Sequence, residues 1–278
     1  MGPQGVPVSV ALAPASAGPR HWQRFPLWKR LARLAFTLCA VAAFVASLRT
    51  IEVIPEFLYD APEQLADLFG RMWPMDAGYV GPTLRALVET LHIATLGTLI
   101  AIAIAVPIGL MAARNVTPNR ALNLFAKFVF VTSRSVNSLV WALLFVAVFG
   151  PGPLAGTLAI ALRSVGFTGK LFAEALEEAN RGSIEALQAA GAGRLSTLLL
   201  GYWPQVKPAF WSIALFRWDI NIRESAVLGL VGAGGIGVAL DTALNLLYWD
   251  QVAVVLAAIF GVVILAEIVV TALRARTL

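Results

Sequence analysis

Long apolar runs separated by short polar turns occupy most of this chain. The runs fall at residues 31–48, 83–113, 119–149, 154–172, 209–231 and 252–273. A helix that crosses a bilayer needs about 20 predominantly apolar residues, and inside lipid each spanning helix must satisfy its own backbone hydrogen bonds. The pattern therefore predicts an all-α, polytopic membrane protein with about six transmembrane helices.

The charges between the apolar runs predict which side of the membrane each turn faces. Lys and Arg residues concentrate in the short loops that stay in the cytoplasm. With six spans, every short basic segment falls on the same side. We expect a multi-pass protein of the bacterial cytoplasmic (inner) membrane with both termini in the cytoplasm. The basic residues behind this expectation are Arg20, Arg24, Lys29, Arg30, Arg33, Arg114, Arg120, Lys170, Arg274 and Arg276.

The N-terminal region is predicted to be a basic tail followed by a membrane helix. Residues 1–30 form the tail, and residues 1–19 are rich in Pro, Gly, Ala and Ser with no charged side chain. This composition is typical of disorder. Residues 31–50 are the first predicted transmembrane helix. A signal peptide is the alternative, but the run is long for one and no clear small-residue cleavage site follows it.

Residues 51–82 differ from the rest because they are acidic. The segment contains several acidic residues and a single basic residue, Arg71. Trp73 and Tyr79 are typical of a membrane–water interface. We expect an external amphipathic segment of one or two short helices lying on the membrane surface. Its acidic residues are Glu52, Glu56, Asp60, Glu63, Asp67 and Asp76.

Composition narrows the possible chemistry. The 278 residues are 59% hydrophobic and 13% charged, with a formal net charge of +5. In a soluble protein this charge would suggest nucleic acid, but here it follows from the cytoplasmic turns, so no nucleic-acid partner is expected. The single cysteine, Cys39, and the distant His21 and His92 offer no disulfide framework and no metal site. We expect no catalytic residue and no cofactor bound by this chain.

Residues 174–208 form the one long polar segment in the C-terminal two thirds. Glu, Ala, Leu and Gln favour helix there, whereas Gly191 and Gly193 interrupt it and Pro204 and Pro208 end it. The segment is too polar to cross a bilayer. It predicts two short helices around a glycine corner, held at the membrane surface as a contact site for another protein. An ordinary amphipathic connector is the alternative.

The same segment resembles the cytoplasmic loop of permease subunits of ATP-binding-cassette (ABC) importers. That loop has the pattern Glu-Ala-Ala, three residues, Gly, nine residues, Ile, one residue, Leu-Pro. Glu185, Ala186, Gly191 and Pro204 match it in register. Three positions depart from the pattern, because Leu187 replaces the second Ala and Gly201 and Trp203 replace Ile and Leu. The resemblance implies that residues 174–208 are a loop that couples the permease to its ATPase.

From Thr83 onward the chain is similar to the phosphonate-importer permeases (PhnE-type), whose relatives serve phosphite and hypophosphite. The segments that carry this similarity include TLHIATLGTLIAIAIAVPIGLMAARN, IEALQAAGAGRLSTLLLGYWPQ and NIRESAVLGLVGAGGIG. The resemblance implies a type I importer (MetI-like) transmembrane domain over 83–278. It also implies a second permease chain, expected to be identical, two cytoplasmic ATPase subunits that use ATP and Mg, and an extracytoplasmic binding protein.

Polar residues inside the predicted spans are candidates for the translocation pathway. Charges within a bilayer are costly and are functional candidates by default, and guanidinium groups suit phosphonate or phosphate oxygens. Arg134 and Arg163 have no acid nearby in sequence. Arg217 and Arg223 could instead pair with Asp219 and Glu224. The candidate set is Arg134, Asn137, Arg163, Asn221, Arg223, Glu224 and Ser225.

A glycine cluster follows the fifth predicted span. Gly232, Gly234 and Gly237 spell G-x-G-x-x-G, but no βαβ pattern surrounds them, so dinucleotide binding is disfavoured. A backbone bend near the outer face is the better interpretation. Together with Gly235, these glycines are candidate gate residues.

Three alternatives stay open at this point. The first is an ABC importer permease for an amino acid or another small organic solute, because the coupling loop is common to such permeases. The second is a passive anion channel, which would have no need of residues 174–208. The third, an intramembrane enzyme, lacks a nucleophile–base pair, since His92 has no partner in the spans.

Overall fold

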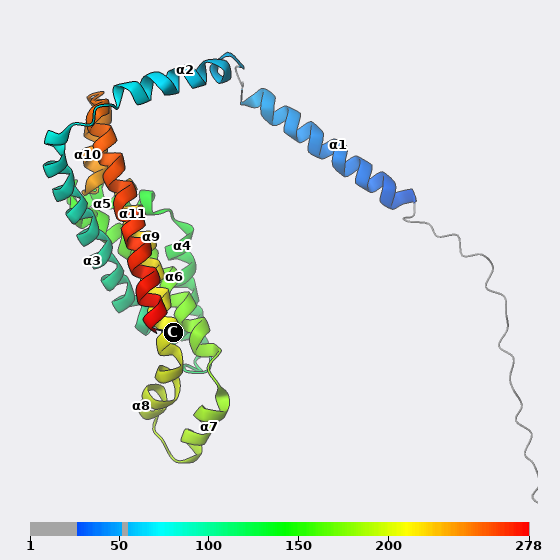
Figure 1. The fold of residues 1–278 in the computed structure, drawn as a ribbon. Coiled ribbons are helices and arrows are strands. Elements are labelled where there is room, and N and C mark those ends of the chain that lie inside the picture. The colour runs from blue at the N-terminus through cyan, green and yellow to red at the C-terminus, as the bar shows by residue number, and fades with distance from the viewer. Residues whose placement is uncertain (1–26, 52–54, 278) are drawn as a thin grey trace, which may run out of the picture. The chain divides into compact units, whose positions relative to one another are not determined.

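The structure is a computed structural model that describes residues 27–51 and 55–277. Within these ranges the chain is helical without any strand (Figure 1). It divides into two units, residues 1–63 and 64–278. The expected tail over residues 1–30, including Arg20 and Arg24, lies almost entirely outside the described residues.

The first unit contains α1 (Leu27–Thr50) and the beginning of α2 (Pro55–Arg71). α1 covers the predicted first span, and none of its side chains is buried. Large apolar residues such as Phe36 and Phe44 are exposed on it. A helix that is apolar on all sides needs an apolar environment, which agrees with a membrane helix. α2 is the short amphipathic helix expected between residues 51 and 82.

The second unit is a bundle of long helices joined by short ones. Figure 1 shows α3, α6, α9 and α11 running lengthwise, with α7 and α8 projecting at one end. In chain order its remaining elements are η1 (Ala77–Tyr79), α3 (Val80–Ala112), α4 (Arg120–Ser135), α5 (Ser138–Phe149), α6 (Pro153–Glu177), α7 (Arg181–Ala189), α8 (Arg194–Ser196), the π-helical turn η2 (Thr197–Tyr202), α9 (Trp203–Leu228), η3 (Gly229–Val231), α10 (Ile236–Asn245) and α11 (Trp249–Thr277).

α6 lies at the centre of the bundle and contacts α3, α4, α5 and α9. Glycines on α3 allow a close approach to α6. A Cβ atom added at Gly97 would lie 2.7 Å from Ile160 Cγ2, and one at Gly109 would lie 2.7 Å from Phe172 Cδ1. Small residues commonly permit such close packing between membrane helices.

The predicted third span is broken into two helices that pass the length and composition test for a span only together. α4 and α5 meet at an angle of 88°. Val136 between them is extended, and the Asn137 side chain accepts a hydrogen bond from Leu139 N at 3.2 Å, which caps α5. Asn is a preferred N-cap residue. Asn137 was therefore a local signal for a new helix start inside an otherwise apolar run.

Judged by their length and composition, fewer helices could cross a membrane than the sequence suggested. Among the described residues, three helices are long and apolar enough to cross a membrane, and five if each of two bent helix pairs counts as one span. The three are α1, the helix that ends at Ala112, and α11. α6 is a continuous 25-residue helix, but Arg163 and Lys170 make it less apolar. A sixth span therefore stays a prediction.

The polar segment 174–208 forms the projecting end of the bundle. α7 is followed by Gly191 with φ of +82°, which is the expected glycine corner. The second short helix is not separate, because α8 continues through η2 into α9. Pro204 thus does not end the segment but lies in the first turn of α9, where a proline is tolerated.

Candidate translocation site

A cluster of buried and half-buried charges joins α6 and α9. The Glu224 carboxylate on α9 lies between two guanidinium groups. Arg163 Nε on α6 is 3.1 Å from Glu224 Oε1, and Arg217 Nη2 is 2.9 Å from Glu224 Oε2. One carboxylate is thus shared by two arginines, and the cluster carries one surplus positive charge.

Hydroxyl and amide groups complete the surroundings of Arg217, which is only 4% exposed. Its Nε donates to Ser164 Oγ at 2.8 Å, and Ser164 Oγ donates to Asn221 Oδ1 at 3.1 Å. Asn221 Nδ2 in turn donates to Thr98 Oγ1 at 2.7 Å. A buried charge is tolerated when it is paired and its remaining donors are satisfied. This chain of bonds connects α3, α6 and α9 rigidly around the charge.

Arg163 differs from Arg217 because part of it reaches the surface. Its side chain is 30% exposed, compared with 5% for Arg217. Arg163 Nη1 donates to the carbonyl oxygen of Val136 at 3.1 Å, at the break between α4 and α5. This bond satisfies a carbonyl group that the break leaves without a helical partner. Arg163 therefore couples the charge cluster to the bend in the third predicted span.

The structure shows which ion pairs the charged residues of the fifth predicted span form. Arg217 pairs with Glu224, and Arg223 pairs with Asp219 at 2.5 Å, one helical turn away. Arg223 also approaches Glu267 of α11 at 4.0 Å. The pairs left open by the sequence are therefore both present.

Arg163 has no acid nearby in sequence, but it has an acidic partner in the folded chain. Glu224 is its partner, and the two residues lie 61 positions apart in the chain. Sequence proximity cannot detect a pair that forms only when α6 packs against α9. The missed members of the cluster are Ser164 and Thr98, and their signal was a polar side chain within an apolar run, whereas Arg217 was named only as a member of a possible ion pair.

Arg134 lies next to this cluster but has no ion-pair partner among the described residues. It is exposed on α4 and passes over α6, since a Cβ atom added at Gly166 would lie 2.8 Å from Arg134 Cγ. Gly166 follows Arg163 by three residues. Arg134 lines a cavity of about 580 Å³ between α4 and α6. It is thus the one candidate whose guanidinium group is both exposed and unpaired in the described part of the chain.

Two other candidates have structural contacts of their own. Asn137 caps α5, as described above. Ser225 Oγ is buried and donates to the carbonyl oxygens of Thr90 and Ile222, at 3.2 and 3.0 Å. The structure therefore brings Arg163, Asn221 and Glu224 together in one network and places Asn137 and Ser225 outside it.

The glycine cluster forms a bend between η3 and α10. Gly232, Gly234 and Gly235 have φ of +82°, +84° and +74°, which L side chains rarely adopt. Gly235 N donates to Glu89 Oε1 of α3 at 3.0 Å, and Gly232 O accepts from Gly152 N at 2.9 Å. Gly237 packs against Gly229. The bend is therefore a compact turn fixed to α3 and to the α5–α6 turn.

The candidate coupling residues lie on the projecting end. Glu185 and Ala186 are exposed on α7, whereas Ile184 is buried and anchors this helix. The Asn180 side chain caps α7 by accepting from Gly182 N at 2.9 Å. An exposed, anchored helix of this kind is a suitable contact surface.

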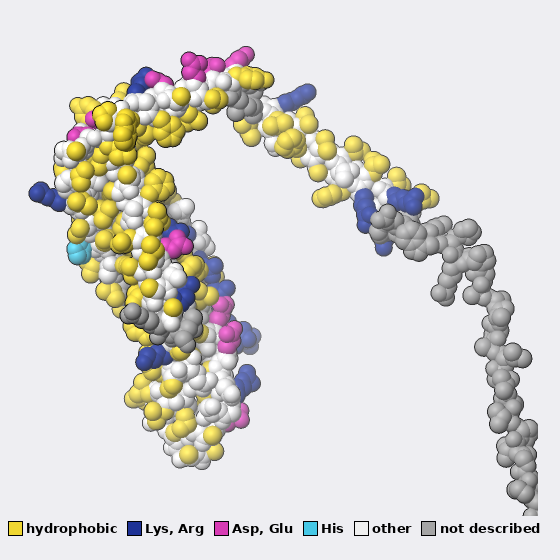
Figure 2. All heavy atoms as spheres, in the orientation of Figure 1, with side chains coloured by type: hydrophobic (Ala, Val, Ile, Leu, Met, Phe, Trp, Pro, Cys, Tyr) yellow, Lys and Arg dark blue, Asp and Glu magenta, His cyan; other side chains and the backbone are white. Residues whose placement is uncertain are grey.

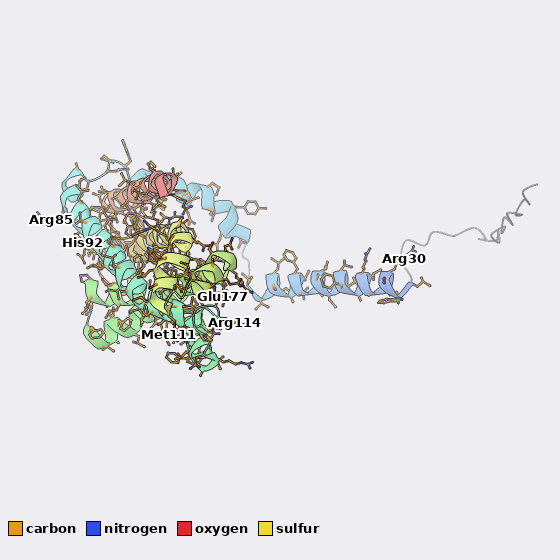
Figure 3. All side chains as sticks on the ribbon, turned by 90° about the horizontal axis from the view of Figure 1, so that it is seen from below. Arg30, Arg85, His92, Met111, Arg114 and Glu177 are labelled. Atoms are coloured by element: carbon orange, nitrogen blue, oxygen red, sulfur yellow. The ribbon has the colours of Figure 1, made fainter. Side chains whose placement is uncertain are left out.

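The base of this projecting end is bonded to the turn between α3 and α4. Arg114 N donates to Glu177 Oε1 at 3.0 Å, and Asn115 Nδ2 donates to Leu176 O at 2.6 Å. Figure 3 shows Arg114 and Glu177 next to each other in the view from below. The C-terminal end of α6, which leads into α7, is therefore bonded directly to the turn before α4.

Comparison with known families agrees with this architecture. A family model described as "Binding-protein-dependent transport system inner membrane component" matches residues 105–277. The chain is 36% identical over 242 residues to the phosphite transport system permease protein PtxC of Stutzerimonas stutzeri, covering 86% of each chain. It is 37% identical over 243 residues to the phosphate-import permease protein PhnE of Mycolicibacterium smegmatis. That match covers 87% of this chain and 46% of the relative, so the chain spans about half of its length.

The fold is similar to that of a solved importer. An inward-facing structure of the MetNI methionine ABC transporter matches with a TM-score of 0.66 and 21% identity, over 73% of this chain and 100% of that one. The resemblance noted from residues 185–204 and from 83 onward is thereby confirmed. The chain belongs to the family of inner-membrane components of binding-protein-dependent transport systems and has the MetI-like fold of type I ABC importer permeases.

Proposed function

We propose that this chain is the permease subunit of an ATP-driven importer that moves phosphonate or a related phosphorus oxyanion by alternating access. Phosphite, hypophosphite and phosphate are the related candidates. The observation that carries the proposal is the similarity to permeases named for phosphate and phosphite over 87% and 86% of the chain.

The charges of the candidate site support an anionic substrate. Arg163 and Arg217 share Glu224, and Arg134 is unpaired among the described residues. Planar guanidinium groups bind two oxygens of a phosphonate or phosphate at once. Arg134 and Arg163 are therefore the proposed contacts of the anion as it crosses the low-dielectric part of the pathway. Binding there must be weak, because the anion has to leave again.

The proposed assembly contains several chains. A second copy of the permease would complete the pathway, and an extracytoplasmic binding protein would deliver the anion. Two cytoplasmic ATPase subunits would hydrolyse ATP with Mg, so this chain would itself be non-catalytic. The exposed face of α7 with Glu185 and the Gly191 corner is the proposed contact for an ATPase subunit, and the glycine bend at 232–237 is the proposed gate.

Uptake measurements test the substrate class. Cells expressing the complete transport system should accumulate labelled phosphonate, phosphite or phosphate in an ATP-dependent manner, while labelled methionine should stay outside. Accumulation of methionine without any phosphorus oxyanion would replace the proposal with the amino-acid alternative. Accumulation of anions without ATP would favour a passive channel.

Substitutions in α7 and at the Gly191 corner should uncouple ATP hydrolysis from transport. Glu185→Lys reverses an exposed charge, and Gly191→Val places a β-branched residue at φ of +82°, which is strained. Both variants should insert and fold normally but lose transport coupled to hydrolysis. The measurement is ATPase activity and uptake in the reconstituted complex. Glu63→Lys on α2 is the matched exposed-glutamate control, and normal coupling in both α7 variants would remove the docking role.

The proposed orientation places residues 51–82 outside and α7 inside. In a Cys39→Ser background, which removes the only cysteine, cysteine introduced at Asp60 should react with a membrane-impermeant thiol reagent in intact cells. Cysteine at Ser183 should react only after the membrane is opened. Both positions are exposed in the structure, so burial does not explain a difference. The reverse labelling pattern would overturn the topology.

A further inference from the structure

α4 carries a row of three cations, of which the proposed pathway uses only Arg134. Arg120, Lys127 and Arg134 recur at intervals of seven residues, and α4 contains no acidic residue. Seven residues make nearly two helical turns, so the three side chains share one face about 10 Å apart. This row begins near the projecting end and stops at the break before α5.

Two cavities follow this face of α4 and adjoin at one residue. A cavity of about 590 Å³ is lined by Arg114, Arg120 and Lys127, and the cavity of about 580 Å³ is lined by Lys127, Arg134 and Lys170. Lys127 borders both. Figure 2 shows Lys, Arg, Asp and Glu side chains gathered along this flank of the bundle towards the projecting end. The cavities thus connect the α4–α5 break with the turn before α4.

The carboxylates of this region are already engaged. Glu174 pairs with Lys170 at 3.4 Å, and Glu177 accepts the bond from Arg114 N described above. Lys127 is half-buried and makes no ion pair within the described residues. Between the lysine and its cationic neighbours lie apolar side chains of α4, including Leu124, Phe130 and Val131. The row is therefore a set of separated positive positions on an apolar wall.

We propose that this face of α4 is an oxyanion track, along which the transported anion passes from Arg134 through Lys127 to Arg120 at the projecting end. The inference rests on the proposed function and adds its exit route. Lys127 lies between Arg134 and Arg120, so it divides the distance of about 20 Å between those two residues into two steps of about 10 Å. Each cation offers a shallow binding position, and the cavities between them are lined by apolar side chains together with a few polar ones, including Glu174 and Glu177. Lys127 is then a residue that determines transport rate without contributing to the charge cluster.

A phosphate group bound to these cations could also come from an anionic lipid headgroup. Both ligands offer the same oxyanion chemistry, so the experiment must separate them. The complete importer with its binding protein is therefore reconstituted in two kinds of vesicle, one of phosphatidylcholine alone and one that also contains phosphatidylglycerol. Uptake of labelled phosphonate, phosphite and phosphate is measured in both.

Lys127→Gln should lower the uptake rate about tenfold in both kinds of vesicle, a change that corresponds to about 1.4 kcal/mol. Lys127→Arg should restore most of the rate, because it keeps the charge. Lys29→Gln, which removes an exposed lysine of α1 outside both cavities, should have no effect. Melting temperatures should be unchanged for all three variants, which excludes a folding defect.

Two results would overturn the track. Wild-type rates for Lys127→Gln in both vesicles would show that the anion does not pass Lys127. A defect confined to vesicles with phosphatidylglycerol would identify a lipid headgroup as the ligand. If vesicles that contain the wild-type importer accumulate none of the three anions, the proposed function is wrong, and the proposed track is then rejected as well. The wild-type rate therefore distinguishes failure of the function from failure of the track.

Discussion

Replacing Glu224 with alanine is expected to destabilise the permease more than any other single change in its charge cluster. The substitution leaves Arg163 and Arg217 without their shared carboxylate, and the Arg217 side chain is only 5% exposed. Breaking a buried ion pair by removing one partner costs about 3–5 kcal/mol, because the remaining charge stays buried. The expected result is a large fall in melting temperature and in the yield of folded protein after detergent extraction.

Glu267→Ala provides the control for this experiment. Glu267 is also a glutamate near an arginine of α9, but its side chain is 69% exposed and lies 4.0 Å from Arg223. Exposed ion pairs contribute about 0–1 kcal/mol, so this variant should melt close to wild type. Glu224→Gln should fall between the two, since it keeps the side-chain shape but not the charge. Equal melting temperatures for both alanine variants would contradict the assigned role of Glu224.

Arg134→Ala is expected to cause the largest loss of transport without a loss of folding. Arg134 is exposed and has no ion-pair partner among the described residues, so its removal leaves no buried charge behind. Two opposite charges 4 Å apart attract by about 4 kcal/mol at an effective dielectric constant of 20. Without this attraction an anion should cross more slowly, by on the order of a hundredfold in uptake rate if about 2.7 kcal/mol is lost.

The measurement is uptake in reconstituted vesicles, with substrate affinity of the binding protein recorded alongside. That affinity should be unchanged, because Arg134 belongs to the permease. Arg134→Lys should be tolerated in part if charge alone matters, and poorly if the guanidinium fork binds two oxygens. Wild-type uptake by Arg134→Ala would remove this residue from the pathway.

A substitution of Arg163 tests the pathway less directly than the sequence suggested. It is bonded to Glu224 and to the Val136 carbonyl group, so Arg163→Ala should disturb both the cluster and the α4–α5 break. A loss of uptake in that variant would have two explanations. Arg134 has no such contacts, and this difference became visible only in the folded chain.

The family and the fold class could be predicted from local features of the chain. Apolar runs long enough to span a bilayer require helices, because lipid offers no hydrogen-bond partner to an exposed backbone. The coupling segment was recognisable because Glu185, Ala186, Gly191 and Pro204 stand at fixed offsets. The positive φ of Gly191 follows from the same local rule, since glycine adopts that conformation without steric cost.

The break between α4 and α5 was predictable only in part. Asn137 is a good N-cap residue, but its neighbours continue the apolar pattern of a single helix. The Val136 carbonyl group that the break exposes is bonded by Arg163, which lies 27 residues further along the chain. The bend is therefore supported by a distant side chain that no local pattern contains.

The amino-acid sequence by itself determined that this chain forms apolar membrane helices with one long polar segment at residues 174–208, because hydrophobic length and turn residues act over a few neighbours. Only the tertiary structure decided which charges meet. Glu224 could have paired within α9 alone, yet the packing of α6 against α9 places Arg163 beside it and leaves Arg134 free of a described partner. Charge pairing depends on distances between helices, and those distances are set by the close contacts of small and apolar side chains throughout the bundle.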